Sequence, residues 1–249
     1  MYTKKLLDIP NFENEKDKAR KFYQENGFFI AEKIFDETEC VNAIEEAKNF
    51  EQYKLQNFIP EIMPHRKNKF FLLMMKNKKL INILNYIMKS DEEIFGLQST
   101  FFHGVPGTSG SSPHQDSLYV NPESYDDFIS AWIPLVNINT ENMGNLILYP
   151  KSHFAGILPV FENDTKNSKH QNDGLVRFES KLKNKKSFDK IKVKVTKGSA
   201  VIMHSNLLHE SIDNLSDKNR NSLLLTYIKD KCGFREGFEA KRKKIPLNI

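Results

Sequence analysis

The ten residues SSPHQDSLYV, numbered 111 to 120, contain a histidine and an aspartate two positions apart. Successive residues of an extended strand point to opposite faces, so His114 and Asp116 would project side by side while Gln115 points away. A neutral imidazole and a carboxylate on one face can share a cation. The pair alone does not define a metal site, because an H-x-D pattern also suits a hydrogen-bonded surface pair.

A third ligand for such a cation is available downstream, in KGSAVIMHSNLLHESIDN. Its two histidines, His204 and His209, fall on a predicted strand, turn and strand, and an antiparallel fold could bring either one beside His114. Two histidines and one carboxylate form the facial triad of non-haem Fe(II) oxygenases, which leaves coordination positions open for cosubstrate and dioxygen. The pattern therefore indicates a catalytic metal rather than a structural one.

A candidate anion clamp follows His209 by eleven residues, in KNRNSLLLTYI. Arg220 and Ser222 would share one face of a strand. A planar guanidinium beside a hydroxyl is suited to hold a carboxylate through two hydrogen bonds, which is the second anchor that an α-keto acid needs. The alternative for Arg220 alone is a surface salt bridge.

The elements that must position these residues change in character near residue 91. Before it, helical spacing predicts a helix that Gly27 ends, a short strand over 28–34, and a helix that Asp36 caps and that runs through Lys48. The stretch NKKLINILNYIMKS predicts a further amphipathic helix.

After residue 91, short apolar or alternating runs are separated by turn residues, among them IFGLQSTFFHGV, FISAWIPLVNI, SAVIMH and NSLLLTYIKD. This texture predicts an antiparallel sandwich or jelly roll. We therefore expect one mainly β domain over 1–249, with flanking helices over 1–90 and the β core over 91–230. The polar stretch at about 161–190 is expected to be a lid or a disordered loop. The closing AKRKKIPLNI is expected to be a solvated tail, with an anion-binding patch as the alternative.

Composition excludes several classes of function. A net charge of +5, with both signs spread throughout, can help to attract an anionic ligand but falls well short of a nucleic-acid footprint. Cys40 and Cys232 form no C-x-x-C pair, which argues against a thiolate zinc site and suits a reducing cytoplasm. No stretch approaches the roughly 20 apolar residues of a membrane span. We expect a cytoplasmic protein without nucleic-acid or membrane partners.

Several ordered motifs resemble the phytanoyl-CoA dioxygenase family of Fe(II)/2-oxoglutarate-dependent oxygenases. FYQENGFFIAEKIFDETEC is similar to the family's N-terminal helix, strand and helix, and PHQD matches its metal motif. SAWIPLVNINTENMGNLILYPKSH resembles the family's central stretch, with Met143 as an insertion in its N-G-x-L motif. KGSAVIMHSNLLHESIDNLSDKNRNSL resembles the segment that carries the distal histidine and the cosubstrate arginine. The resemblance implies a double-stranded β-helix, a cupin-like jelly roll, with N-terminal helices packed on it.

Residue by residue, the resemblance assigns the metal site to His114, Asp116 and His209. It makes Arg220 the clamp on the distal carboxylate of 2-oxoglutarate, and the spacing to this arginine favours His209 over His204. Ser211 and Trp132 fall where the family lines its cosubstrate pocket, and Ser222 is the hydroxyl inferred above. The implied cofactors are Fe(II), 2-oxoglutarate and O2.

The implied reaction couples oxidative decarboxylation of 2-oxoglutarate, which yields succinate and carbon dioxide, to attack on an unactivated C–H bond. An intact carboxylate at Asp116 favours hydroxylation, because related halogenases replace it with a small residue. Desaturation and ring formation begin with the same hydrogen abstraction and stay open.

We expect a small polar or anionic substrate, because the stretch at 161–190 is rich in basic residues, including Lys166, Lys169, Arg177, Lys181 and Lys183. Two other classes stay open. One is a hydroxylase of a protein or nucleic acid, which would need a groove for a macromolecule. The other is a non-catalytic, cupin-like sensor or scaffold, which would have no use for a carboxylate clamp such as Arg220 with Ser222.

Overall fold

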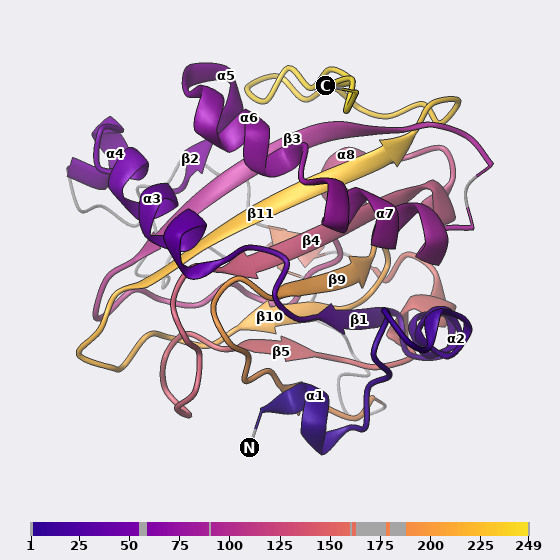
Figure 1. The fold of residues 1–249 in the computed structure, drawn as a ribbon, viewed down its shortest axis with the longest axis horizontal. Coiled ribbons are helices and arrows are strands. Elements are labelled where there is room, and N and C mark those ends of the chain that lie inside the picture. The colour runs from indigo at the N-terminus through magenta and orange to yellow at the C-terminus, as the bar shows by residue number, and fades with distance from the viewer. Residues whose placement is uncertain are drawn as a thin grey trace.

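The computed structural model describes residues 2–54, 59–89, 91–159, 161–162, 178–179 and 188–248. Its centre is a six-stranded antiparallel sheet with the strand order β1-β9-β4-β11-β3-β2 (Figure 1). In chain order these strands are β1 (Phe28–Ala31), β2 (Glu61–Ile62), β3 (Ile94–Gly104), β4 (Phe128–Pro134), β9 (Ala200–His204) and β11 (Arg220–Lys229). A smaller antiparallel sheet has the order β10-β5-β8 and consists of β5 (Leu146–Leu148), β8 (Ile191–Lys192) and β10 (His209–Ser211).

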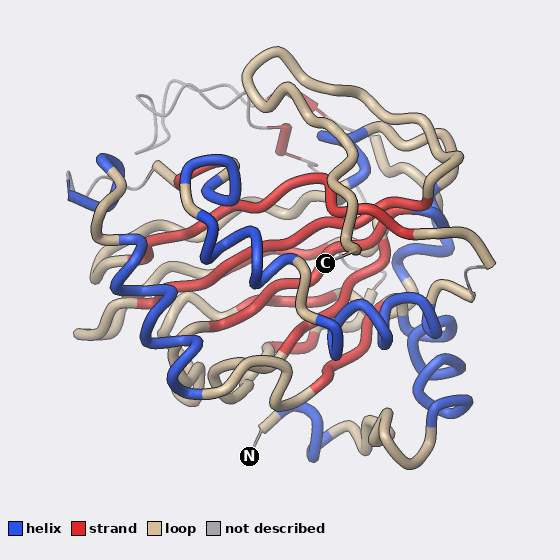
Figure 2. The backbone as a smooth tube through the Cα atoms, turned by 45° about the horizontal axis from the view of Figure 1, so that its top comes forward, coloured by secondary structure: helices blue, strands red, loops and turns tan. Residues whose placement is uncertain are grey.

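Helices cover one face of the large sheet (Figures 1 and 2). In the described residues the α-helices are α1 (Thr3–Leu6), α2 (Lys16–Asn26), α3 (Glu37–Ala47), α4 (Glu51–Lys54), α5 (Pro64–Lys67), α6 (Lys69–Met75), α7 (Lys78–Ile87) and α8 (Ser117–Val120). Two 3-10 turns, η1 (Tyr125–Asp127) and η2 (Ser152–Ala155), complete them. The mainly β architecture with flanking helices predicted from the sequence is confirmed.

Strand β11 is central because it pairs with β3 on one side and β4 on the other. Its residues Leu223, Leu225 and Tyr227 are fully buried and belong to the core beneath the helices, where the Tyr227 hydroxyl donates a hydrogen bond to the Met75 carbonyl of α6 at 3.0 Å. Because strand residues alternate, Arg220 and its alternate neighbours point to the opposite face. We call this opposite face of the large sheet the inner face.

The N-terminal elements form where the sequence predicts them. Gly27 ends α2 with a left-handed φ of 77°, and a side chain there would meet the ring of His153. Asp36 caps α3 through a capping box, in which its carboxylate accepts from the Glu39 amide and the Glu39 carboxylate accepts from the Asp36 amide, both at 2.8 Å. The predicted strand at 28–34 is shorter, ending at Ala31.

The C-terminal segment differs from the prediction. Ile245 and Gly96 exchange backbone hydrogen bonds of 2.8 and 3.0 Å, and Leu247 is buried in the main core. The expected solvated tail is therefore wrong, because this segment pairs with β3 near its first residues.

The predicted lid lies mostly outside the described residues. Within it, β6 (Phe161–Glu162) pairs with β7 (Phe178–Glu179) in antiparallel fashion. Over the described ranges, no helix has the length and apolar character that a membrane crossing requires.

Candidate active site

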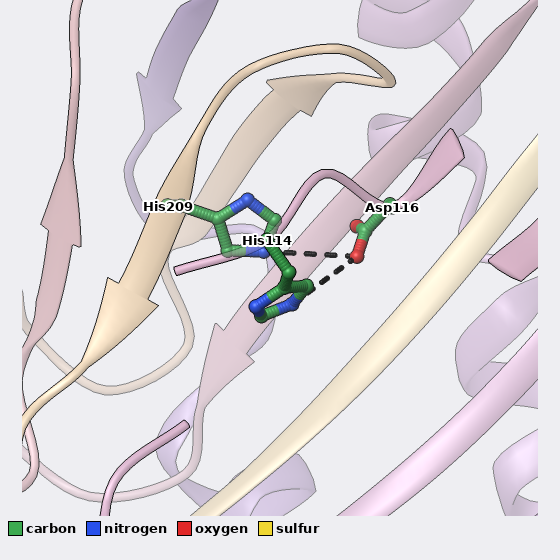
Figure 3. Close-up of side chains that lie close together, drawn as sticks. All are labelled: His114, Asp116 and His209. Carbon is green, nitrogen blue, oxygen red and sulfur yellow. Dashed lines mark ion pairs between the residues drawn. The ribbon is translucent and has the colours of Figure 1, made fainter. Parts of the chain in front are cut away.

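Two histidines are held side by side by their own backbones. The His114 amide donates to the His209 carbonyl at 2.9 Å, and the His209 amide donates back to the His114 carbonyl at 3.0 Å. This antiparallel bridge joins the 111–116 segment to β10 and brings the two ring centroids to 4.2 Å (Figure 3). The sequence pattern alone allowed either His204 or His209 to lie beside His114, and His209 is the residue that does so.

A second hydrogen bond fixes the tautomer of each ring. His114 Nδ1 lies 2.7 Å from the Ser112 carbonyl, and His209 Nδ1 lies 3.0 Å from the Leu207 carbonyl. A carbonyl only accepts, so the proton of each ring sits on Nδ1 and the lone pair sits on Nε2. This arrangement is the one that histidine metal ligands use.

Asp116 completes the group, and its side chain accepts no hydrogen bond from the described residues. Its Oδ1 lies 3.7 Å from His114 Nε2 and 3.6 Å from His209 Nε2, too far for hydrogen bonds. Dashed lines in Figure 3 mark these two ion pairs. The other oxygen, Oδ2, is buried without a partner among the described residues, and the side chain is 8% exposed. One ligand atom from each of the three residues lies within 4.8 Å of the others. A buried, unpaired carboxylate facing two lone pairs fits a cation.

Burial keeps the His114 ring neutral. Desolvation, with a smaller contribution from the neighbouring His209, lowers the pKa of His114 to about 4, and Asp116 opposes this shift. At neutral pH the His114 imidazole is therefore already in the unprotonated form that binds a metal.

The local backbone differs from the continuous strand predicted for this segment. His114 makes a single β-bridge, and Asp116 already has helical dihedral angles (φ −63°, ψ −29°) at the start of α8. The predicted strand through Asp116 is therefore wrong, although the two side chains converge as expected. A helical turn directly after a bridge brings the carboxylate to the same place.

Gln115 points away from the metal group, as predicted, and anchors two other segments. Its buried amide nitrogen donates to the Gly156 and Asn206 carbonyls at 2.8 and 2.7 Å, and its oxygen accepts from the Leu158 amide at 2.9 Å. The sequence analysis assigned no role to this residue. Its position between two candidate metal ligands is the sequence feature that could have indicated this anchoring role.

Arg220 is a buried cation on the inner face at the start of β11. Its Nε and Nη2 atoms donate to the Gly144 carbonyl at 2.9 and 2.7 Å, and its guanidinium lies 5.4 Å from the centroid of the Trp132 ring. Burial lowers the pKa of Arg220 to about 10, so the side chain stays charged at neutral pH. Within the described part of the chain no carboxylate forms an ion pair with it, so the predicted alternative of a surface salt bridge is wrong.

The two serines named from the sequence differ in their surroundings. Ser222 is fully buried, two residues from Arg220, and its hydroxyl has no partner in the described ranges. Ser211 at the end of β10 accepts from the Ser111 amide at 2.8 Å and lies 3.0 Å from the Ser111 hydroxyl. Ser222 therefore offers an unused hydroxyl on the inner face, whereas the hydroxyl of Ser211 already binds a neighbouring loop.

His204 makes structural hydrogen bonds, as the sequence analysis expected. Its Nδ1 accepts from the Asn206 amide at 3.0 Å and its Nε2 lies 2.9 Å from Asp126 Oδ1. His103, next to the loop before the metal motif, stacks on Tyr53 with a centroid distance of 3.8 Å. Neither ring belongs to the group formed by His114, Asp116 and His209.

Comparison with solved structures identifies the fold. Among solved structures, the α-ketoglutarate-dependent carbocyclase SnoK from nogalamycin biosynthesis superposes with a TM-score of 0.71 at 17% identity, covering 92% of this chain and 90% of that one. The epimerase SnoN in complex with Fe3+, α-ketoglutarate and nogalamycin RO gives 0.67 at 14% identity, with 95% and 88% covered. The fold is thus the cupin-like fold of iron- and 2-oxoglutarate-dependent oxygenases.

Sequence comparison identifies the family. The model of the phytanoyl-CoA dioxygenase family matches residues 23–222. A phytanoyl-CoA dioxygenase of Arabidopsis thaliana is 25% identical over 249 residues, which cover 97% of this chain and 80% of the relative. The chain belongs to the phytanoyl-CoA dioxygenase family, and it is an oxygenase that depends on iron and 2-oxoglutarate.

Proposed function

We propose that His114, Asp116 and His209 hold Fe(II), and that the protein hydroxylates an unactivated C–H bond of a small polar or anionic metabolite. The observation that carries this proposal is the convergence of two imidazole Nε2 atoms on a buried carboxylate whose Oδ2 has no hydrogen-bond donor among the described residues. Two histidines and one carboxylate leave open positions on the metal, as an oxygenase requires. Iron with 2-oxoglutarate and O2 supplies the oxidising power, and succinate and carbon dioxide are released.

Arg220 is the residue that would bind the distal carboxylate of 2-oxoglutarate. A buried guanidinium without an ion pair among the described residues is costly unless an anion joins it. The hydroxyl of Ser222 lies on the same face and can add a hydrogen bond, and Trp132 supports the guanidinium plane. Ser211, whose hydroxyl is bonded to Ser111, would line the site rather than bind the cosubstrate.

The Asp116 carboxylate supports hydroxylation over halogenation. Asp116 retains the carboxylate at the metal site, which leaves no place for a halide. The comparison proteins SnoK and SnoN are described as a carbocyclase and an epimerase, so the same fold also serves reactions that do not end in a hydroxyl group. The lysines and arginine that motivate an anionic substrate lie outside the described residues.

The metal and cosubstrate assignment is tested by anaerobic titration of metal-free protein with Fe(II) and then 2-oxoglutarate, following the visible charge-transfer band of the chelate. We expect the band in the wild type, its loss in His209→Ala, and a weaker 2-oxoglutarate affinity in Arg220→Gln. His204→Ala is the matched control, because this buried histidine lies outside the metal group, and it should retain the band. A wild type that binds iron but gives no band contradicts the proposal and favours a non-catalytic scaffold.

Substrate scope is tested by succinate release in the presence of a metabolite panel. A small acid or polar metabolite should raise succinate release and gain one oxygen atom, detected by mass spectrometry. Substituting Lys166, Lys169 and Lys181 should then raise the Michaelis constant for that compound. An unchanged Michaelis constant contradicts the role of these lysines, and a product without added oxygen indicates desaturation or ring formation.

A further inference from the structure

A second buried arginine, Arg242, belongs to the C-terminal segment that pairs with β3. Its side chain is 7% exposed. Its Nε donates to the Gln98 side-chain oxygen at 2.7 Å, and its Nη1 lies 3.2 Å from the carbonyls of both Arg235 and Glu236. The sequence favoured a solvated tail over an anion-binding patch for the run AKRKKIP that contains this residue, because the run has the composition of a solvated segment.

The charge of Arg242 has no counterion in the described part of the chain. All its hydrogen-bond acceptors there are neutral, and none of them binds Nη2. Burial lowers the pKa of Arg242, which reflects the cost of keeping this cation away from water. A buried guanidinium with free N–H groups is suited to an oxyanion ligand.

Strand register places the Gln98 contact on the inner face. Across β3 and β11, Gln98 is opposite Thr226 and Gly104 is opposite Arg220, and directly opposed residues share a face. Gln98 also donates to the Thr100 hydroxyl at 3.0 Å, which leaves its oxygen for Arg242. Gln98, which contacts Arg242, and Gly104, which is opposite Arg220, are six positions apart on β3, about 20 Å along the strand.

Helix α8 connects Arg242 to the metal group. The Arg235 carbonyl accepts a hydrogen bond from Arg242 Nη1 at 3.2 Å, and the Arg235 amide donates to the Val120 carbonyl of α8 at 2.7 Å. Helix α8 begins directly after the candidate ligand Asp116. Arg220 thus lies at one end of the inner face, and Arg242 lies towards the other end, next to the segment that follows Asp116. A substrate held near the metal would extend towards Arg242 on the side away from the cosubstrate.

We propose that Arg242 binds an anionic group, a carboxylate or a phosphate, of the primary substrate. The inference rests on the proposed function and deepens it, because it names the substrate's recognition element. Gln98 positions the guanidinium, and the N–H groups on Nη2 remain for the substrate oxygens. Specificity for an acid would then come from the C-terminal segment and not only from the basic residues at 161–190.

The test is anaerobic calorimetric titration of the Fe(II)- and 2-oxoglutarate-loaded protein with three probes of one chain length: hexanoate, hexyl phosphate and neutral hexanamide. We expect at least one anionic probe to bind about tenfold or more tightly than hexanamide, and Arg242→Gln to remove that preference. Hexanoate against hexyl phosphate decides between a carboxylate and a phosphate. Arg242→Lys keeps the charge without the planar fork and should retain part of the preference.

Arg66→Gln is the matched control, because it removes contacts to the same C-terminal segment without changing Arg242. Arg66 is exposed and donates to the Ala240 and Lys241 carbonyls at 2.9 and 2.7 Å, so it holds the same segment from outside. This variant should keep the anion preference. Equal binding of all three probes to the wild type overturns the inference, and so does an equal loss of preference in Arg66→Gln and Arg242→Gln.

The 2-oxoglutarate band separates this inference from the proposed function. Arg242→Gln should retain the band at the wild-type 2-oxoglutarate affinity. If the variant loses the band while the wild type has it, Arg242 belongs to the cosubstrate site and the inference is wrong. A wild type without the band contradicts the proposed function instead.

Discussion

The Asp116 carboxylate favours metal binding but lowers the stability of the metal-free protein. Its buried carboxylate faces the Nε2 atoms of His114 and His209 at 3.7 and 3.6 Å, and these atoms are acceptors that cannot donate to it. Without a cation, a buried acceptor that lacks a donor costs about 1–3 kcal/mol. The metal-free protein therefore carries a local cost that the bound cation removes.

We predict that Asp116→Asn stabilises the metal-free protein by about 1 kcal/mol, because the amide removes the charge and can donate to a histidine Nε2. Metal affinity should fall steeply in the same variant. Urea unfolding in the presence of EDTA measures the first effect and Fe(II) titration the second. A variant less stable than the metal-free wild type would show that the carboxylate has a donor in the folded protein.

His65 gives a residue-scale prediction for pH. It is buried, its Nδ1 lies 2.6 Å from the Ser99 hydroxyl, and its Nε2 has no partner in the described residues. Burial, with a smaller contribution from Arg66, lowers the pKa of His65 from 6.5 to about 4. Between these values the unfolded chain binds a proton that the folded protein does not, so the free energy of unfolding falls as pH falls through this window.

The loss of stability attributable to His65 should reach about 2 kcal/mol at pH 5. We expect His65→Gln to remove this part of the pH dependence, so that the unfolding free energy of the wild type, relative to the variant, decreases between pH 7.5 and pH 5. Urea unfolding of both proteins at each pH provides the measurement. Parallel curves would contradict the shift.

At the scale of elements, Gln115 joins the ligand segment to two loops that surround it. Replacing it with alanine leaves the Gly156 and Asn206 carbonyls and the Leu158 amide without their partner. We predict that Gln115→Ala lowers the unfolding free energy by about 3 kcal/mol and weakens metal binding, because the segment that carries both ligands loses its anchor. The exposed Gln24→Ala should change stability by less than about 0.5 kcal/mol. Similar effects of the two variants in chemical denaturation would exclude an anchoring role.

Local signals predicted the elements well where they act within a few residues. Gly27 and Asp36 end and begin helices because a left-handed turn and a capping box depend only on neighbouring residues. The H-x-D pattern predicted convergence of two side chains but not the backbone, since a bridge followed by a helical turn gives the same result. The burial of Arg242 could not be predicted, because it depends on pairing between residues 96 and 245.

At the scale of the whole molecule, the metal group joins segments that are far apart in the chain. His114 and Asp116 precede α8, whereas His209 lies on β10 of the smaller sheet. A metal that binds all three stabilises only the folded protein, by about 2.7 kcal/mol at a free concentration one hundred times its dissociation constant.

We therefore expect Fe(II) to raise the thermal midpoint under anaerobic conditions, and 2-oxoglutarate to raise it further only when metal is present. Differential scanning fluorimetry of the wild type and of His209→Ala gives the comparison. His209→Ala should show neither increase. Stabilisation by 2-oxoglutarate alone would indicate that Arg220 binds it independently of the metal.

The reciprocal backbone hydrogen bonds between His114 and His209 should also keep the site in shape when its metal ion is absent. Both amide protons are engaged inside the protein, so they should exchange slowly with solvent whether or not iron is bound. Because the imidazoles are set by this bridge and not by the cation, losing the ion need not open the site. Release and reloading of the ion would then require no refolding of this segment.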